Sequence, residues 1–262
     1  MFAAADAYER FMGRWSRRLA PLFVAFASVT DADSVLDAGS GTGALASAIA
    51  DAHPSARVTA VDSSETYVRY AQKRRSSERL QFAVGDLQSL GTSTASFDKT
   101  LSLLTLNFVP DRERALHEMI RVTKEGGVVA AAVWDYGFRM EMLRLFWDEA
   151  VALDSAVADR DERYMPLCGR GELSELWRAG GLNSVDEQAL PITLEFSSFA
   201  DYWAPFLGGQ GPAGEHVVSL SRPDRAALES RLRRRLLHGR RDGSFTLQAR
   251  AWAVRGKTPT TT

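Results

Sequence analysis

Three acidic residues stand at similar places in the first third of the chain. Asp37, Asp62 and Asp86 each follow a short apolar run that is rich in strand-forming residues. These runs alternate with segments of helical character, which predicts a sheet of parallel strands. The carboxyl ends of such strands meet at one edge of the sheet, where ligands bind. We therefore expect the three carboxylates to surround a single ligand.

The turn after Asp37 carries glycines at positions 39, 41 and 43 and leads into an alanine-rich run with good helix propensity. A strand, a glycine turn and a helix open a nucleotide-binding βαβ unit, in which glycine lets a ligand approach the backbone. The spacing is one residue shorter than the dinucleotide fingerprint. A carboxylate at Asp37 would repel a pyrophosphate and attract an ammonium group. The turn therefore favours a cofactor other than NAD.

The other two acids extend this interpretation. An acid at the end of the second strand can hold a ribose diol, although Asp62 could instead cap the following helix together with Ser63 and Ser64. Asp86 can accept a hydrogen bond from the amino group of an adenine while Leu87 lies against the ring. Gly85-Asp86-Leu87 is also a common turn, so its meaning depends on the two acids before it.

The composition limits the class of protein. The 262 residues are 45% hydrophobic and 25% charged, with a net charge of −1, which is typical of a soluble globular chain and not of a dedicated nucleic-acid binder. Cys168 is the single cysteine, so neither a disulfide framework nor a cysteine metal cluster is expected. No apolar run reaches membrane-spanning length. We expect a cytoplasmic protein with a small-molecule partner, without nucleic acid, membrane or metal.

These residues resemble a known family. Residues 35–43 (VLDAGSGTG) look like motif I of class I S-adenosylmethionine-dependent methyltransferases, and Asp62 matches the ribose acid of that family. Residues 97–127 resemble the small-molecule branch that includes the ubiquinone and menaquinone C-methyltransferases (methyltransferase type 11), with Glu125 in place of the usual proline. Residues 8–16 (YERFMGRWS) are similar to the N-terminal segment of uncharacterised members.

The resemblance implies an α/β fold: a doubly wound, seven-stranded, mostly parallel Rossmann-like sheet with an antiparallel last strand. It implies S-adenosylmethionine as cofactor and S-adenosylhomocysteine as product. The ammonium group would contact Asp37, and the ribose would contact Asp62. The adenine would contact Asp86 and Leu87. Leu103 would offer a carbonyl to the methionine moiety, and Arg14 would pair with the carboxylate. The expected cofactor residues are Arg14, Asp37, Gly39, Ser40, Gly41, Asp62, Ser63, Asp86, Leu87 and Leu103.

We expect one domain with four parts: an N-terminal helical lid (1–29), a cofactor-binding core (30–135), a helical acceptor-side insertion with the sixth strand (136–243), and the last strand with its tail (244–262). Pro21 would break the first helix or begin the first turn of a second one, and the apolar stripe would be Phe11, Trp15, Leu19 and Leu22. This helix either packs its aromatics on the domain or covers the ligand with Tyr8, Met12 or Arg14. Residues 154–163 would be mobile, and 208–214 would form a flexible loop.

Few residues could do acid–base chemistry in the second half. A base is needed only where the acceptor must lose a proton. The candidates are His216, which follows a glycine-rich loop, and Asp135 and Tyr136, which follow the fifth strand. The arginine cluster around residues 231–235 is interpreted as a solvated helix face, with an anionic-substrate or RNA patch as the alternative.

The sequence thus predicts in-line methyl transfer to an O-, C- or N-nucleophile of a small molecule, with an aromatic acceptor as one option. Two alternatives remain at this point: an NAD(P)-linked oxidoreductase, and a non-catalytic nucleotide-binding protein on the same fold. The acceptor and the oligomeric state stay open.

Overall fold

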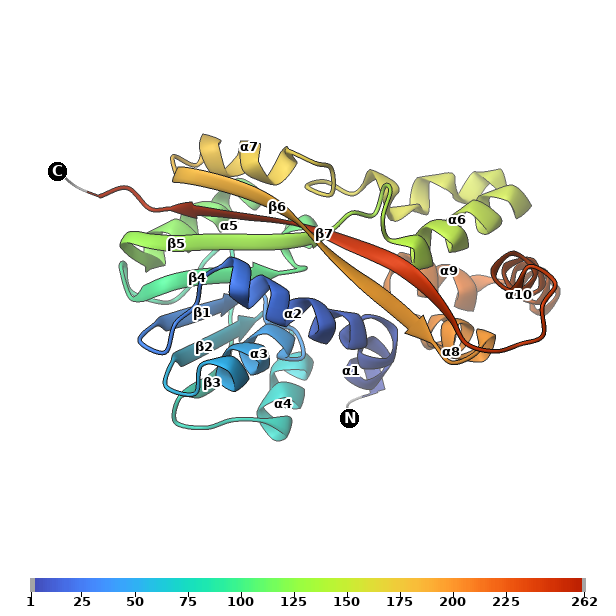
Figure 1. Cartoon of the computed structure of the whole chain (residues 1–262), viewed down its shortest axis with the longest axis horizontal. Helices are drawn as coiled ribbons and strands as arrows, with labels where there is room; N and C mark the ends of the chain where they lie inside the picture. The colour runs from blue at the N-terminus through green and yellow to red at the C-terminus, as the bar shows by residue number, and fades with distance from the viewer. Residues whose placement is uncertain (1–2, 261–262) are drawn as a thin grey trace.

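The computed structural model describes residues 3–260, and its centre is a seven-stranded sheet in the order β3-β2-β1-β4-β5-β7-β6 (Figure 1). The first five strands are parallel, and β7 runs antiparallel to both β5 and β6. This confirms the predicted sheet with its antiparallel last strand. The strands are β1 (Ser34–Ala38), β2 (Arg57–Asp62), β3 (Leu80–Val84), β4 (Phe97–Leu103), β5 (Thr123–Trp134), β6 (Asn183–Phe196) and β7 (Phe245–Lys257).

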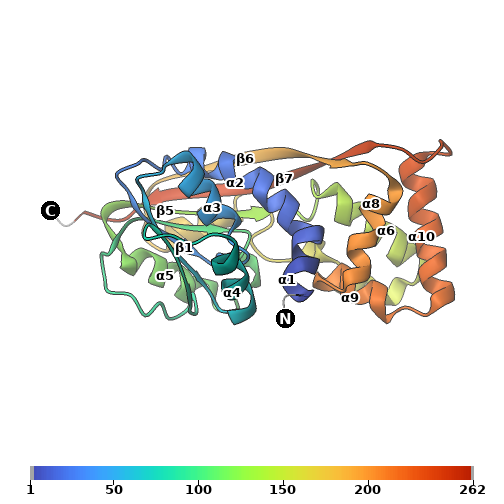
Figure 2. The ribbon, with the colours of Figure 1, turned by 90° about the horizontal axis from the view of Figure 1, so that it is seen from below.

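Helices cover both faces of the sheet. On one face α2 packs beside α3, and on the other lies α5 (Figure 2). Trp177 of α7 is fully buried, and its indole N–H donates to the carbonyl of Val129 on β5 (2.9 Å). None of the helices between residues 3 and 260 combines the length and the apolar character that a membrane crossing requires. The covering helices are α2 (Arg14–Phe26), α3 (Ala44–Ala52), α4 (Glu65–Arg74), α5 (Arg112–Val122) and α7 (Glu172–Ala179).

The last two strands continue beyond the sheet. The pairing of β7 with β5 ends where Trp134 meets Ala251, whereas residues 245–250 of β7 still pair with 191–196 of β6. This two-stranded ribbon reaches a group of helices beyond the carboxyl ends of the parallel strands (Figure 1). The group contains α6 (Glu141–Leu153), η3 (Ser155–Arg160), η4 (Glu162–Tyr164), α8 (Phe199–Trp203), η5 (Ala204–Gly208), α9 (Gly211–Ser219) and α10 (Arg222–Leu237).

The N-terminal segment forms one nearly continuous helix: α1 (Ala3–Tyr8), a π-helical turn η1 (Glu9–Gly13) and α2. The predicted break at Pro21 is wrong, because α2 continues through this residue with buried side chains on both sides of it. The predicted stripe also ends differently. Leu22 is 42% exposed and Phe23 is fully buried, since a spacing of four residues keeps positions 11, 15, 19 and 23 on one face.

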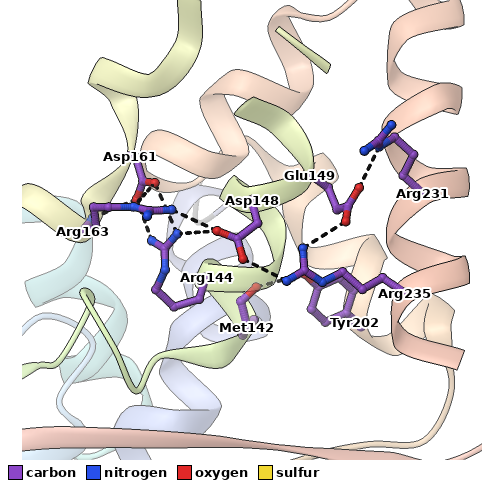
Figure 3. Close-up of polar contacts among 9 residues, drawn as sticks. All are labelled: Met142, Arg144, Asp148, Glu149, Asp161, Arg163, Tyr202, Arg231 and Arg235. Carbon is purple, nitrogen blue, oxygen red and sulfur yellow. Dashed lines mark hydrogen bonds and ion pairs between the residues drawn. The ribbon is translucent and has the colours of Figure 1, made fainter. Parts of the chain in front are cut away.

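A network of ion pairs joins the turns η3 and η4 to α6 and α10 (Figure 3). The Asp161 carboxylate accepts hydrogen bonds from Arg144 (2.8 Å) and Arg163 (2.6 Å), and both guanidinium groups also reach Asp148. The stretch 154–163, expected to be mobile, instead forms two 3₁₀ turns with Asp161 buried among these cations.

The network continues into α10. Arg235 donates to both Asp148 and Glu149, and Arg231 donates to Glu149 (2.7 Å) (Figure 3). The prediction that the arginine cluster is only a solvated face is therefore wrong, because two of its members hold α10 against α6. The predicted loop at 208–214 also differs, since α9 begins at Gly211.

We expect Asp161→Asn to lower the free energy of unfolding by about 3 kcal/mol, because it leaves the nearly buried Arg144 without its closest counter-charge. Asp51→Asn is the matched control, since the Asp51–Arg75 pair lies at the surface and its loss should cost under about 1 kcal/mol. Urea unfolding curves measure both changes. Equal losses for the two variants would contradict the structural role of the network.

Candidate functional site

Three adjoining cavities lie along the carboxyl ends of β1, β2 and β4. We call them the outer, central and aromatic cavities, with volumes of about 250, 290 and 160 Å³. Gly39, Asp62 and Thr105 line both the outer and the central cavity. Tyr8 and Tyr67 line both the central and the aromatic cavity. Phe108 lines all three, so the cavities adjoin one another.

The glycine turn forms the floor of the central cavity. A Cβ on Gly39 would lie 2.3 Å from the Thr105 side chain, whose hydroxyl donates to the Gly39 carbonyl (2.8 Å). The first glycine is therefore required by the close approach of the loop after β4. Gly41 has a φ of +52° and faces open space, so a ligand can reach the backbone there.

Asp37 has a carboxylate oxygen in this cavity that lacks a hydrogen-bond partner among the described residues. It is fully buried, and its Oδ2 accepts a hydrogen bond from the Ala46 N–H at the start of α3 (3.0 Å). Its Oδ1 has no hydrogen-bond partner within the described chain. Burial, with a smaller effect of the nearby Asp62 charge, raises the pKa of Asp37 to about 7. A cationic group would complete the hydrogen bonding of this oxygen.

Asp62 sits between the central and outer cavities. Its carboxylate accepts hydrogen bonds from the N–H groups of Gly41 and Ser64, both at 2.8 Å. The cap of α4 is Ser64, whose hydroxyl accepts from the Tyr67 N–H (3.4 Å). The carboxylate is thus fixed in orientation, and the free lone pairs of its oxygens can still accept hydrogen bonds from a diol.

The remaining expected cofactor residues fall into two groups. Ser63, Asp86 and Leu87 line the outer cavity, and Ser40 and Leu103 line the central one. Arg14 lies elsewhere: its guanidinium pairs with Asp201 (2.7 Å) and stacks 4.1 Å from the Trp15 ring. The cofactor role expected of Arg14 therefore has no contact to support it in this structure.

Of the residues expected to act on the acceptor, Tyr136 lines the aromatic cavity, and burial raises the pKa of its phenol. Asp135 is buried beside it, but its carboxylate is held by Arg250 and by the Phe138 N–H. His216 packs against the ring of Trp147 (5.6 Å between centroids), and burial lowers the pKa of its imidazole. Neither Asp135 nor His216 belongs to the described lining of the cavity.

Sequence reasoning missed Glu162. This buried residue lines the aromatic cavity, and its carboxylate accepts a hydrogen bond from the indole of Trp147. Burial raises its pKa to about 7. No local pattern could have identified it, because it lies in a polar stretch whose position depends on distant ion pairs. Tyr8 and Met12, suggested above as lid residues, also line this cavity.

The raised pKa of Asp37 gives a testable pH dependence. Between about pH 4 and 7 the folded chain keeps a proton on this carboxyl that the unfolded chain has released. The free energy of unfolding therefore falls as the pH rises through this window. Asp37→Asn should therefore gain stability relative to the native protein as the pH rises through this window, by about 4 kcal/mol. Urea unfolding without cofactor at several pH values measures the difference. A difference that does not change with pH would contradict the raised pKa.

Comparisons with known proteins agree with this geometry. Residues 36–131 match the family model of the methyltransferase domain. The chain is 31% identical over 183 residues to a malonyl-acyl-carrier-protein O-methyltransferase of Geobacter sulfurreducens, a match that spans 69% of this chain and 66% of that protein.

Solved structures share the fold. One is a putative methyltransferase in complex with a Haloferax volcanii methyltransferase activator (TM-score 0.61, 20% identity, 99% of this chain and 98% of that chain). Another is a Haemonchus contortus phosphoethanolamine N-methyltransferase solved with S-adenosyl-L-methionine (TM-score 0.60, 18% identity, 99% of this chain and 58% of that chain). The chain belongs to the class I S-adenosylmethionine-dependent methyltransferases.

Proposed function

We propose that this protein transfers a methyl group from S-adenosylmethionine to a small-molecule acceptor. The observation that carries the proposal is the unpartnered oxygen of Asp37 in the central cavity, which adjoins the outer cavity with Asp86 and the aromatic cavity. An amino-acid tail, a ribose and an adenine need these groups in this order, and the methyl acceptor needs a separate space beside them.

Each part of the cofactor has residues suited to it. Asp37 would take the ammonium group, and Asp62 would take the ribose hydroxyls. Leu87 offers an apolar wall to the adenine, and the neighbouring Asp86 offers an acceptor for its amino group. The orphaned carboxylate oxygen and the open backbone at Gly41 fit this cofactor without any change of the turn.

The cofactor supplies an electrophilic methyl group on a sulfonium ion. The chain supplies position: holding the two reactants in line can provide roughly 7–11 kcal/mol of barrier reduction. Most side chains that line the aromatic cavity are apolar or aromatic, which would limit the access of water to the reacting atoms. The single cysteine, Cys168, is buried and unpaired, which suits a reducing compartment such as the cytoplasm.

The alternatives are less well supported. An NAD(P)-linked oxidoreductase would place a pyrophosphate against Asp37, where the two negative charges repel. A non-catalytic nucleotide-binding protein needs no second cavity beside the cofactor. The acceptor named for the Geobacter relative is also a poor match, because the described lining of the aromatic cavity contains no lysine, arginine or histidine to pair with a carboxylate.

We expect Asp62→Ala to weaken S-adenosylhomocysteine binding by about 1–3 kcal/mol, because the ribose loses its acceptor and the Gly41 N–H loses its partner. Glu65→Gln is the control: Glu65 follows closely in sequence, but it is exposed and pairs with Arg69. Isothermal titration calorimetry measures both affinities. Unchanged binding by the Asp62 variant would overturn its role.

The same titration distinguishes a methyltransferase from an NAD(P)-linked oxidoreductase. We expect S-adenosylmethionine to bind and NADH and NADPH not to bind. Tight binding of a nicotinamide cofactor without binding of S-adenosylmethionine would favour the oxidoreductase alternative. A screen of phenols, amines, carboxylates and quinone precursors, followed by release of S-adenosylhomocysteine, then tests for turnover.

A further inference from the structure

We propose that the acceptor is an amine, and that Glu162 binds its ammonium group in the aromatic cavity and takes one of its protons before methyl transfer. This inference rests on the proposed function and adds the substrate class and a catalytic residue. Three features of the described chain support it: the lining of the cavity, the fixed position of Glu162, and the charge of the approach to it.

The lining of the aromatic cavity is suited to a cation. Among the described residues it contains six aromatic rings and a single charged side chain, the carboxylate of Glu162. Aromatic faces attract ammonium groups, and the attraction is strongest where water is excluded. The rings belong to Tyr8, Phe11, Tyr67, Phe108, Trp134 and Tyr136.

Hydrogen bonds fix the position of the Glu162 side chain. The indole of Trp147 donates to its carboxylate, and the Ala213 N–H near the start of α9 contributes a favourable contact. The preceding residue, Asp161, is fixed by Arg144 and Arg163 (Figure 3). The ion pairs therefore neutralise Asp161 and leave Glu162 as the charge that faces the cavity.

The approach to Glu162 from solvent is acidic. A more open cavity of about 580 Å³ shares Glu162 and Pro212 with the aromatic cavity. The exposed residues Asp159 and Glu215 line it, with Arg160 as its one described cation. Because Asp161 is already paired, the net charge of this opening is negative, which raises the local concentration of cations and lowers that of carboxylates.

The chemistry also needs a base in this position. An ammonium nitrogen has no free electron pair, and its charge repels the sulfonium of the cofactor in the adjoining cavity. Transfer of one N–H proton to the Glu162 carboxylate leaves a neutral amine. Its electron pair then forms the N–C bond to the methyl group as the C–S bond breaks, and that bonding pair stays on sulfur. The proton on Glu162 leaves to solvent with the product.

Burial supports this role, because it raises the pKa of Glu162 to about 7, near the pH at which a general base works best. The volume of about 160 Å³ limits the acceptor. A dry cavity of similar size holds a single benzene ring, so we expect an amine whose buried part is no larger than one ring.

The experiment compares ligands that share a phenyl ring and a linker and differ in the terminal group, which is cationic, neutral or anionic. The probes are 2-phenylethylamine with 2-phenylethanol and 3-phenylpropionate, and benzylamine with benzyl alcohol and phenylacetate. Calorimetry measures their binding at pH 7.5 with and without S-adenosylhomocysteine. We expect each amine to bind at least about tenfold more tightly than its alcohol and its acid, and only the amines to release S-adenosylhomocysteine from S-adenosylmethionine.

Two variants test the role of Glu162 in amine binding and proton transfer. Glu162→Gln keeps an acceptor for the Trp147 indole but should lose the preference for amines and lower kcat, whereas Glu175→Gln, at an exposed site on α7, should change neither. Thermal melting establishes that both variants are folded. If no amine binds better than its alcohol, or if Glu162→Gln keeps the preference, the inference is wrong.

Measurement of cofactor binding distinguishes failure of the inferred amine acceptor from failure of the proposed methyl transfer. Binding of S-adenosylmethionine without any preference for amines overturns the acceptor class alone. A preference for amines without binding of S-adenosylmethionine supports the site at Glu162 and overturns the methyl transfer.

Discussion

The carboxylate of Asp62 holds together the two strand ends on which the whole cleft is built. It accepts one hydrogen bond from the glycine turn after β1 and one from the first residues after β2. This double contact sets the path of the turn, while the pairing of β1 with β2 and β4 places Asp37 beside it. Because a charged acceptor forms stronger hydrogen bonds than a neutral one, the turn keeps its shape without a ligand.

The acceptor side depends on a different kind of interaction. The carboxyl ends of the parallel strands leave the aromatic cavity open, and the helical group carried by the β6–β7 ribbon closes it. Ion pairs between α6, η4 and α10 fix this group (Figure 3). The core of the sheet is stabilised by burial and strand pairing, and the acceptor half combines these ion pairs with a buried aromatic cluster that includes Phe146, Tyr202 and Phe206.

This division explains what the sequence could predict. The strands, the glycine turn and the three acids are local patterns, and the structure places these acids along one cleft. The acceptor half has no such pattern. Arg235 lies 86 residues from Glu149, its ion-pair partner, and no periodicity within either segment indicates that they meet. His216 follows a glycine-rich stretch, as a catalytic loop residue would. The stretch becomes the start of α9, however, and the imidazole packs against Trp147.

Tyr8 and Tyr67 form a wall that belongs to both the central and the aromatic cavity, with their ring centroids 5.6 Å apart. A ligand on either side restricts the same two rings. Conformational entropy that these rings lose to one ligand would not be lost again to the other, which would link the affinities of the two ligands. By thermodynamic reciprocity, whatever factor the cofactor adds to acceptor binding, the acceptor adds to cofactor binding. Through the two tyrosines, the complex that holds both ligands would be favoured over the complex with the cofactor alone.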